Sequence, residues 1–284
     1  MLSYRHAFHT GNHADVLKHT ILLETLSYLK RKDKGWYYLD THAGAGCYSL
    51  ASDTSAGQLA EYQAGAARIW TADDLPEALA AYREALLPFN PDGELEVYPG
   101  SPALAMQAAR PQDRLRLFEL HPADFQALGE TFANDTARVQ CRRSDGFQGL
   151  TALLPPPTRR AVVLIDPSYE VKDDYRRVVD SLHEALERFP QGSYLLWYPL
   201  LDRPEVRQLG SQLQKLAQDL PAWLHARLQV RRAQRGQYGM YGSGMFVINP
   251  PWVLPARLEA ALAWLAKELG EDEGAGFELE HQIR

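Results

Sequence analysis

The sequence predicts an α/β protein built on a doubly wound, mostly parallel sheet with helices on both faces. Short apolar runs alternate along the chain with stretches whose apolar residues recur every three to four positions. One apolar run leads into a glycine-rich turn, and acidic residues stand where several runs end. Strands that alternate with helices pair in parallel, so these ends should meet at one edge of the sheet, where such folds bind ligands.

The first predicted element is an amphipathic helix over 14–31, which ends in the basic residues Lys30 and Arg31. A strand over 36–40 then enters the turn formed by 41–46, which holds two glycines. Four further buried strands are predicted at 114–120, 137–144, 161–167 and 193–200, and helices at 122–131, 173–189, 203–220 and 255–269. The stretch 238–252 predicts a glycine-interrupted hairpin that leads into a closing strand.

One interval is too long for a single strand-helix unit. Asp40 and Glu119 end consecutive strands of the predicted core. The interval between them is far longer than the roughly 20 residues expected between a glycine turn and the acidic residue that ends the next strand. The stretch between them is rich in Ala, Glu, Gln and Leu, with apolar residues at helical spacing. We therefore expect one domain over 1–284 that carries a small inserted helical subdomain at about 53–95.

Composition excludes several classes of protein. The 284 residues are 45% hydrophobic and 23% charged, close to ordinary globular usage, and the formal charge of −6 argues against a protein that coats nucleic acid by bulk electrostatics. A local basic surface that binds nucleic acid remains an alternative. No apolar stretch is long enough to span a membrane, so a soluble, cytoplasmic protein is expected. Cys47 and Cys141 form neither a disulfide framework nor a zinc motif.

The glycine turn favours a cofactor other than a dinucleotide. Gly44 and Gly46 allow a close backbone approach, but Ser49 stands where the dinucleotide fingerprint needs a glycine. An acidic strand end before the turn suits a cofactor with a cationic amino-acid part, as in S-adenosylmethionine. Glu119 could accept hydrogen bonds from its ribose, and Asp145 from its adenine amine. A nicotinamide-dependent dehydrogenase would use a similar sheet but gives no role to Asp166.

The tetrapeptide Asp166-Pro167-Ser168-Tyr169 follows the apolar run AVVLI and is the most specific motif of the chain. In motifs of the D/N-P-P-Y/F type, the acidic or amide side chain and the next backbone carbonyl hold an exocyclic amine. The aromatic ring stacks on the flipped base. This arrangement predicts methyl transfer to an NH2 group, with orientation supplying much of the acceleration.

At this point the sequence resembles a known family, the bacterial 23S ribosomal RNA adenine-N6 methyltransferases of the J type, which are class I S-adenosylmethionine enzymes. The resemblance covers nearly the whole chain. Its motifs here are MLSYRH at 1–6, FH at 8–9, GNHADVLKH at 11–19, LDTHAGAG at 39–46, YPGSP at 98–102, ELHP at 119–122 and DG at 145–146.

The resemblance implies a Rossmann-like fold with a seven-stranded sheet and a helical insertion. It also implies S-adenosylmethionine as cofactor and one adenine of 23S ribosomal RNA as substrate, in naked RNA or an early assembly intermediate. A monomer that needs neither metal nor membrane is expected. The implied cofactor contacts are His19, His42, Ser101, Glu119, Asp145, Gly146 and Asp166, to which the turn adds Gly44.

Catalysis is assigned to Asp166, Pro167 and Tyr169, with Asp166 acting on the target amine. Tyr4 would touch the RNA by the resemblance. Arg5 and Lys18 supply cations in the same amino-terminal segment, which we interpret as an arm that meets phosphate and base. Tyr169 would stack on the base.

Ser168 departs from the family pattern, which has a second proline at this position. The loop keeps Pro167 and Tyr169 but loses rigidity, so a catalytically impaired RNA-binding module remains an alternative. Transfer to DNA adenine or to a protein glutamine amide also remains open, because the tetrapeptide recognises an amine and not a polymer.

Three other patterns have weaker readings. The histidines at 6, 9, 13 and 19 lack the spacing and companion ligands of a metal site. Neither cysteine is placed for attack on a cytosine ring. The stretch 231–239 combines arginines with tyrosine and glycine, which suits either a substrate-binding loop or a plain surface hairpin.

Overall fold

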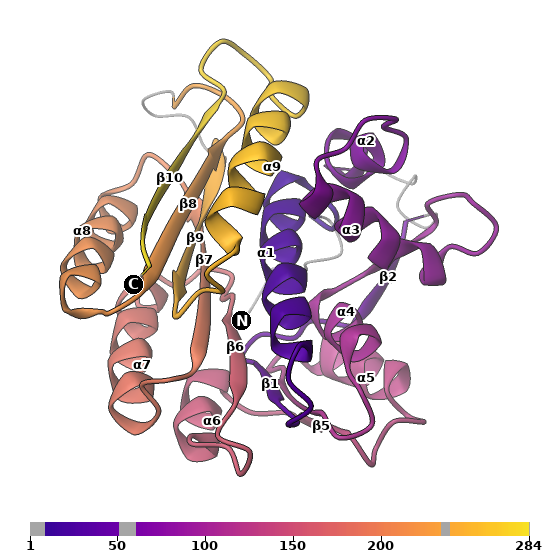
Figure 1. The fold of residues 1–284 in the computed structure, drawn as a ribbon, viewed down its shortest axis with the longest axis vertical. Helices are drawn as coiled ribbons and strands as arrows, with labels where there is room; N and C mark the ends of the chain where they lie inside the picture. Colours follow the sequence, from indigo (N-terminus) through magenta and orange to yellow (C-terminus); the bar gives the residue numbers. More distant parts are fainter. Residues whose placement is uncertain (1–8, 51–60, 234–238, 284) are drawn as a thin grey trace.

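The computed structural model describes residues 9–50, 61–233 and 239–283 (Figure 1). An eight-stranded sheet in the order β10-β8-β9-β7-β6-β1-β4-β5 lies at its centre. Its strands are β1 (Tyr37–Asp40), β4 (Arg114–Phe118), β5 (Val139–Arg142), β6 (Ala161–Ile165), β7 (Ser193–Leu200), β8 (Trp223–Gln229), β9 (Gly242–Ile248) and β10 (Gly276–Gln282). The neighbouring strands β7, β6, β1, β4 and β5 are parallel to one another. The remaining strands β9, β8 and β10 extend the sheet beyond β7 with antiparallel pairing. The predicted doubly wound α/β fold is confirmed.

Strand β6 shows why these residues form a central strand. All five residues of AVVLI are buried, as expected for a strand covered on both faces. Val162 and Leu164 pack into one core cluster, and Val163 and Ile165 into the other. Because successive side chains point to opposite faces, this run fills both cores at once and ends at Asp166 on the carboxyl edge.

Helices cover both faces of the sheet. One core cluster contains residues of α1 (His13–Lys30), α4 (Ser101–Ala108), α5 (Pro122–Thr131) and α9 (Leu254–Glu268). The other contains residues of α6 (Gly146–Leu153), α7 (Asp174–Arg188) and α8 (Pro204–Asp219). A separate two-stranded sheet pairs β2 (Cys47–Ser49) with β3 (Val97–Pro99). None of the helices in the described ranges is long and apolar enough to cross a membrane.

Residues 61–90 are helical where the structure describes them. They form α2 (Ala66–Trp70), α3 (Glu77–Leu86) and two 3₁₀ turns, Glu61–Ala64 and Leu87–Phe89. Figure 1 shows α3 beside α1 and α9, and these three helices contact one another. Arg257 of α9 links them, because its guanidinium donates to Glu24 of α1 at 2.9 Å and also pairs with Glu77 of α3.

Replacing Arg257 by methionine is expected to lower the free energy of unfolding by about 2 kcal/mol. The substitution leaves the nearly buried carboxylate of Glu24 without its cation, and hydrogen bonds to charged groups contribute about 1.5–3 kcal/mol. Urea unfolding measures the change. Lys267→Met on the same helix is the matched control, because Lys267 is 80% exposed and, among the residues that the structure describes, forms an ion pair only with its neighbour Glu268. Equal losses in both variants would contradict the assigned role.

The sheet corrects two details of the sequence-based prediction. It has eight strands instead of seven, because the acidic stretch near the carboxyl terminus forms the edge strand β10 against β8. The segment 242–248 does not close the sheet, since β9 lies between β7 and β8. The exposed polar residues Glu278, Glu280 and His281 of β10 obscured its strand character, and Arg227 of β8 neutralises the two glutamates.

Candidate active site

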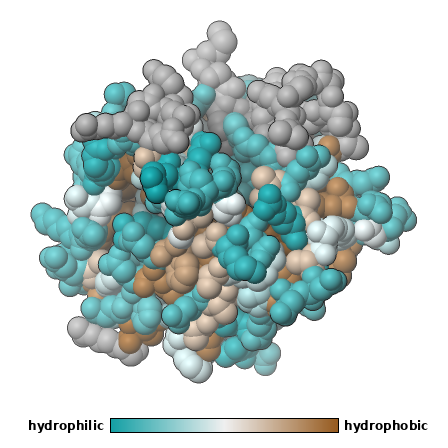
Figure 2. Space-filling model, turned by 90° about the horizontal axis from the view of Figure 1, so that it is seen from above, coloured by the Kyte–Doolittle hydropathy of each residue, from teal (hydrophilic) through white to brown (hydrophobic). Residues whose placement is uncertain are grey.

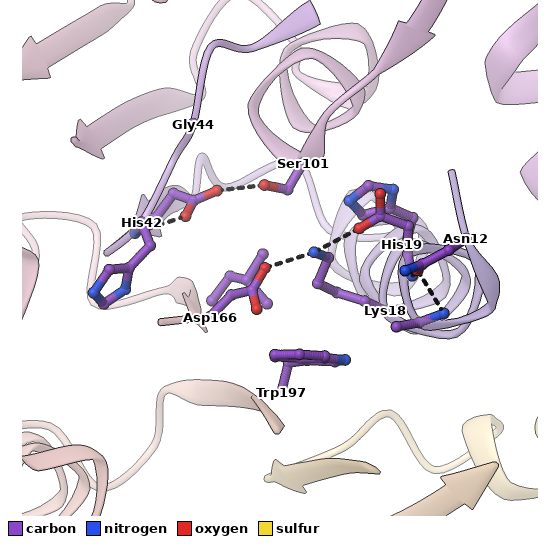
Figure 3. Close-up of polar contacts among 12 residues, drawn as sticks. Asn12, Lys18, His19, His42, Gly44, Ser101, Asp166 and Trp197 are labelled. Carbon is purple, nitrogen blue, oxygen red and sulfur yellow. Dashed lines mark hydrogen bonds and ion pairs between the residues drawn. The ribbon is translucent and has the colours of Figure 1, made fainter. Parts of the chain in front are cut away.

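A buried ion pair lies at the carboxyl end of β6 (Figure 3). The Lys18 ammonium is 2.5 Å from Oδ2 of Asp166 and 2.8 Å from Oδ1 of Asp15. Lys18 is only 4% exposed. Burial lowers the pKa of the Lys18 ammonium, but the carboxylates of Asp15 and Asp166 raise it by more. Lys18 is therefore charged, and it fixes the side chain of Asp166 in one place.

The start of α1 holds this lysine in position. Asn12 caps the helix, and its Oδ1 accepts hydrogen bonds from the amides of Ala14 at 2.9 Å and Asp15 at 3.1 Å. Asp15 in turn accepts from the amide of Gly11 at 2.8 Å through its second oxygen. The GNHADVLK motif thus forms the start of α1 and places the Lys18 side chain at the end of β6.

Aromatic side chains surround the ion pair. The indole of Trp197 on β7 lies beside Lys18 and Asp166 (Figure 3), with its ring centroid 5.8 Å from the Lys18 ammonium. Tyr169 is 3% exposed, and its hydroxyl donates to the carbonyl oxygen of Trp197 at 2.7 Å. Its φ of 54° is a left-handed conformation that costs a tyrosine about 1–2 kcal/mol. The Tyr169 ring therefore points inward here, and stacking on a base requires this loop to rearrange.

Glu119 lies against the glycine turn. One carboxylate oxygen accepts from the amide of Gly44 at 2.8 Å, and the other from the amide of His121 at 2.7 Å. Gly44 has a φ of 61°, and a Cβ there would lie 2.2 Å from the hydroxyl of Tyr48, so only glycine fits. Burial raises the pKa of Glu119. Its remaining lone pairs can accept hydrogen bonds from ligand hydroxyls.

Asp145 begins α6 and lies at the same edge of the sheet. It caps the helix by accepting from the amide of Phe147 at 2.9 Å, and Arg177 of α7 pairs with its second oxygen. The Arg177 guanidinium also stacks over the Phe147 ring at 4.4 Å. A Cβ at Gly146 would lie 2.0 Å from the carbonyl oxygen of Thr41. Glycine at 146 therefore lets α6 approach the turn after β1.

Asp40 is fully buried at the end of β1. Its Oδ2 accepts from the hydroxyls of Tyr38 at 2.6 Å and Ser101 at 2.7 Å, and its Oδ1 from the amide of His42 at 3.2 Å. Burial raises its pKa to about 6. Burial also lowers the pKa of His42 to about 4, so His42 is neutral at pH 7. Asp40 and Ser101 brace the turn from within.

The raised pKa of Asp40 predicts a pH dependence of stability. An acid whose pKa is higher in the folded than in the unfolded state destabilises the fold when ionised, and this cost disappears as the pH falls through 6. From pH 7 to pH 4 the group should add about 2 kcal/mol to the free energy of unfolding, since at pH 4 the unfolded chain has only half taken up its proton. Urea unfolding should show that the wild type gains this amount of stability relative to Asp40→Asn between pH 7 and pH 4, and a difference between the two proteins that does not change with pH would contradict the assignment.

Of the four amino-terminal histidines, His6 lies outside the described residues, and His9, His13 and His19 make separate contacts. His9 pairs with Glu61 at 2.9 Å, and burial lowers the pKa of His13 to about 4. His19 hydrogen-bonds the hydroxyl of Tyr98 at 2.9 Å, and this hydroxyl is 3.0 Å from that of Tyr82. No three His, Cys, Asp or Glu side chains of the described ranges are grouped to hold a metal ion.

The structure brings most of the residues singled out in the sequence to one edge of the sheet. Tyr4 and Arg5 lie outside the described residues. Sequence reasoning missed three partners that define the site, namely Asp15, Trp197 and Arg177. Asp15 could have been found, since it stands one helical turn before Lys18; the other two come close only through the tertiary fold.

The donor set fits S-adenosylmethionine. Glu119 and Asp145 offer carboxylate oxygens at the ends of neighbouring strands β4 and β5, beside the open turn at Gly44. Acidic groups suit a cofactor that carries an ammonium, a sulfonium and ribose hydroxyls. His42 and Ser101 make polar contacts with Thr41 and Asp40 at the adjoining turn, and His19 hydrogen-bonds the hydroxyl of Tyr98.

Comparison with known proteins agrees with this geometry. A family model described as "RsmJ: Ribosomal RNA large subunit methyltransferase D, RlmJ" matches residues 33–281. A protein of Escherichia coli (strain K12) named "Ribosomal RNA large subunit methyltransferase J" is 47% identical over 272 residues, which cover 95% of this chain and 94% of that protein. One of the same name from Haemophilus influenzae is 45% identical over 278 residues, 97% and 96% of the two chains.

A solved structure shows the same fold at full length. The crystal structure of a protein from Legionella pneumophila superposes with a TM-score of 0.86 at 33% identity and covers 96% of this chain and 98% of that one. Sequence and fold therefore agree over nearly the whole length. The chain belongs to the large-subunit ribosomal RNA methyltransferase family that the matching model describes, and it is an S-adenosylmethionine-dependent enzyme.

Proposed function

We propose that the protein transfers one methyl group to the exocyclic N6 amine of an adenine in 23S ribosomal RNA. The observation that carries this proposal is the Asp166 carboxylate at the end of β6, held in one place by Lys18 and followed by Pro167 and Tyr169. The relatives named above point to large-subunit ribosomal RNA. The tetrapeptide points to a planar amine.

When bound, S-adenosylmethionine supplies an electrophilic methyl group, and the residues of this chain prepare the amine. Glu119, Asp145, Gly44, Gly146, His19, His42 and Ser101 would hold the cofactor. Asp166 accepts a hydrogen bond from one N–H of the amine, and the carbonyl oxygen of Pro167 accepts from the other. These contacts turn the nitrogen lone pair toward the methyl group, and orientation of this kind supplies much of the acceleration.

The Lys18 ammonium stays positively charged beside Asp166 during the reaction. It is already neutralised by two carboxylates and buried, so its role is to position Asp166, and a phosphate contact would require it to leave both partners. Tyr169 would stack on the target base after its loop rearranges, and Tyr4 and Arg5 would meet the RNA from the amino-terminal segment.

We further propose that residues 53–95 form a subdomain inserted into a single domain over 1–284. Its described part is braced against the core by Arg257. The enzyme would act as a monomer in the cytoplasm, where ribosomal RNA is assembled, and would need no metal for this chemistry.

The test offers labelled S-adenosylmethionine with unmodified 23S ribosomal RNA, intact large subunits, genomic DNA and a glutamine-containing peptide in parallel. N6-methyladenosine in the RNA, identified by nucleoside mass spectrometry, is the expected product. Label in DNA or peptide alone would refute the RNA assignment. If the protein binds the cofactor but labels no substrate, it is a catalytically impaired binding module. The variant Ser168→Pro would then test whether Ser168 causes the impairment.

A further inference from the structure

The sheet carries a group of arginines that the chemistry at Asp166 does not use. Arg114 and Arg116 lie on β4, and Arg142 lies on β5. In the parallel register Arg116 pairs with Gln140 and Phe118 with Arg142. Since paired residues and residues two apart share a face, all three arginines project from the same face of the sheet. We call these three residues the arginine stripe.

Part of this face is open. The glycine at 149 places α6 directly over Phe118, so α6 covers the carboxyl half of β4 on this side. Toward the amino end, Arg114 and Arg116 are half-buried, and on the edge strand Gln140 and Arg142 are exposed. Tyr37, the partner of Arg114 on β1, completes the surface, and its ring lies 5.2 Å below the Arg116 guanidinium.

The arginine stripe is not neutralised by the protein. Within the described residues, none of its members pairs with a carboxylate. Arg114 donates to the carbonyl oxygens of Pro111 and Asp113, Arg116 to that of Leu115, and Arg142 to the side chain of Gln140. Burial lowers the pKa of Arg116, the neighbouring Tyr37 offsets part of this effect, and the cations of Arg142 and Arg114 lower the pKa further.

Three mutually repelling cations on a chain of net charge −6 point to an anionic ligand. Guanidinium groups bind phosphate through paired donors and keep their charge when stacked on a ring. The stripe lies two and three strands from β6, roughly 10–15 Å to its side. Arg114 is level with Ala161, five residues before Asp166, so it lies roughly 16 Å farther from that end along the strand. A base that reaches Asp166 does not extend that far, but the nucleotides flanking it do.

We infer that the arginine stripe binds the phosphate backbone of the RNA segment that flanks the target adenine. This inference rests on the proposed function. Phosphate contacts fix the register of an RNA without reading its sequence, so the stripe would orient a folded RNA while the pocket at Asp166 selects the base. The arginine stripe would not increase the affinity for the isolated target nucleotide, which is too short to reach it.

The test compares Arg114→Gln/Arg116→Gln/Arg142→Gln with the wild type, using a long fragment of unmodified 23S ribosomal RNA and a short hairpin. We expect the Kd for the long RNA at 0.15 M salt to rise at least about tenfold. The slope of log K against log salt should become shallower by about 2–3, since each lost contact removes about 0.7–0.9. The Kd for S-adenosylmethionine and kcat at saturating RNA should stay unchanged.

Two further variants make the result specific. Arg176→Gln/Arg188→Gln/Arg207→Gln removes three exposed cations from α7 and α8 and should leave the salt slope near that of the wild type. Replacing the three arginines by lysines should restore most of the salt slope. The slope depends on the number of positive charges and not on the hydrogen bonds that the arginines make to nearby carbonyl oxygens. A thermal melt shows whether the glutamine variant is folded.

An unchanged Kd and slope in the folded glutamine variant would overturn the inference, as would an equal loss in the control variant. The binding measurements do not depend on turnover. If the wild type binds RNA but methylates none of it, the proposed function fails, and the salt slopes still decide the role of the stripe. If the wild type binds no RNA, both proposals are refuted.

Discussion

Replacing Asp166 by alanine is expected to lower kcat for methyl transfer by about 10²–10⁴-fold. The variant loses the acceptor that holds the amine, and Lys18 keeps only Asp15 as a partner. Single-turnover methylation at saturating cofactor isolates this effect from the weaker cofactor binding that the same substitution can cause. Calorimetry with S-adenosylmethionine alone then measures the binding loss separately.

Asp166→Asn separates hydrogen bonding from charge. It keeps an acceptor oxygen of the same size but removes the charge that Lys18 pairs with, so we expect an activity between those of the alanine variant and the wild type. Wild-type kcat in the alanine variant would exclude Asp166 from the reaction. Wild-type activity in the asparagine variant alone would show that the ion pair serves stability and not chemistry.

The parallel core could be predicted because each of its strands is a short apolar run. β6 and β7 are buried along almost their whole length, and such runs stand out in any sequence. β10 could not be predicted in this way, since exposed residues such as Glu278, Glu280 and His281 dominate it. Its place is set by pairing with β8, which is a long-range contact that no local pattern encodes.

The same distinction applies to the site. Asp166, Glu119 and Asp145 could be found because each follows an apolar run, where parallel strands present their ligand-binding ends. The burial of Lys18 and the inward position of Tyr169 could not be found, because they depend on α1 crossing the end of β6 and on the carbonyl oxygen of Trp197. Motifs give the residue types at a site, and packing decides which of them face the ligand.

Replacing Lys18 by methionine is expected to lower the free energy of unfolding by about 3–5 kcal/mol at pH 7 and to reduce methylation strongly. Methionine preserves the length of the side chain but leaves Asp15 and Asp166 as neighbouring carboxylates without their shared cation. Removing one partner of a buried pair costs this much because the remaining charge stays desolvated. Urea unfolding measures the loss, and Lys30→Met at the exposed end of the same helix is the matched control.

The pH dependence of this loss distinguishes charge from packing. Without Lys18 the carboxylates of Asp15 and Asp166 repel each other in the folded state while both are ionised, and protonation of either one relieves this repulsion. The destabilisation should therefore be full at pH 7 and shrink as the pH falls toward 4. The wild type should show no such recovery from this cluster, because the ammonium of Lys18 holds its proton throughout that range. A loss of equal size at pH 7 and pH 4 would mean that Lys18 contributes by packing alone, and its assignment as the residue that positions Asp166 would be wrong.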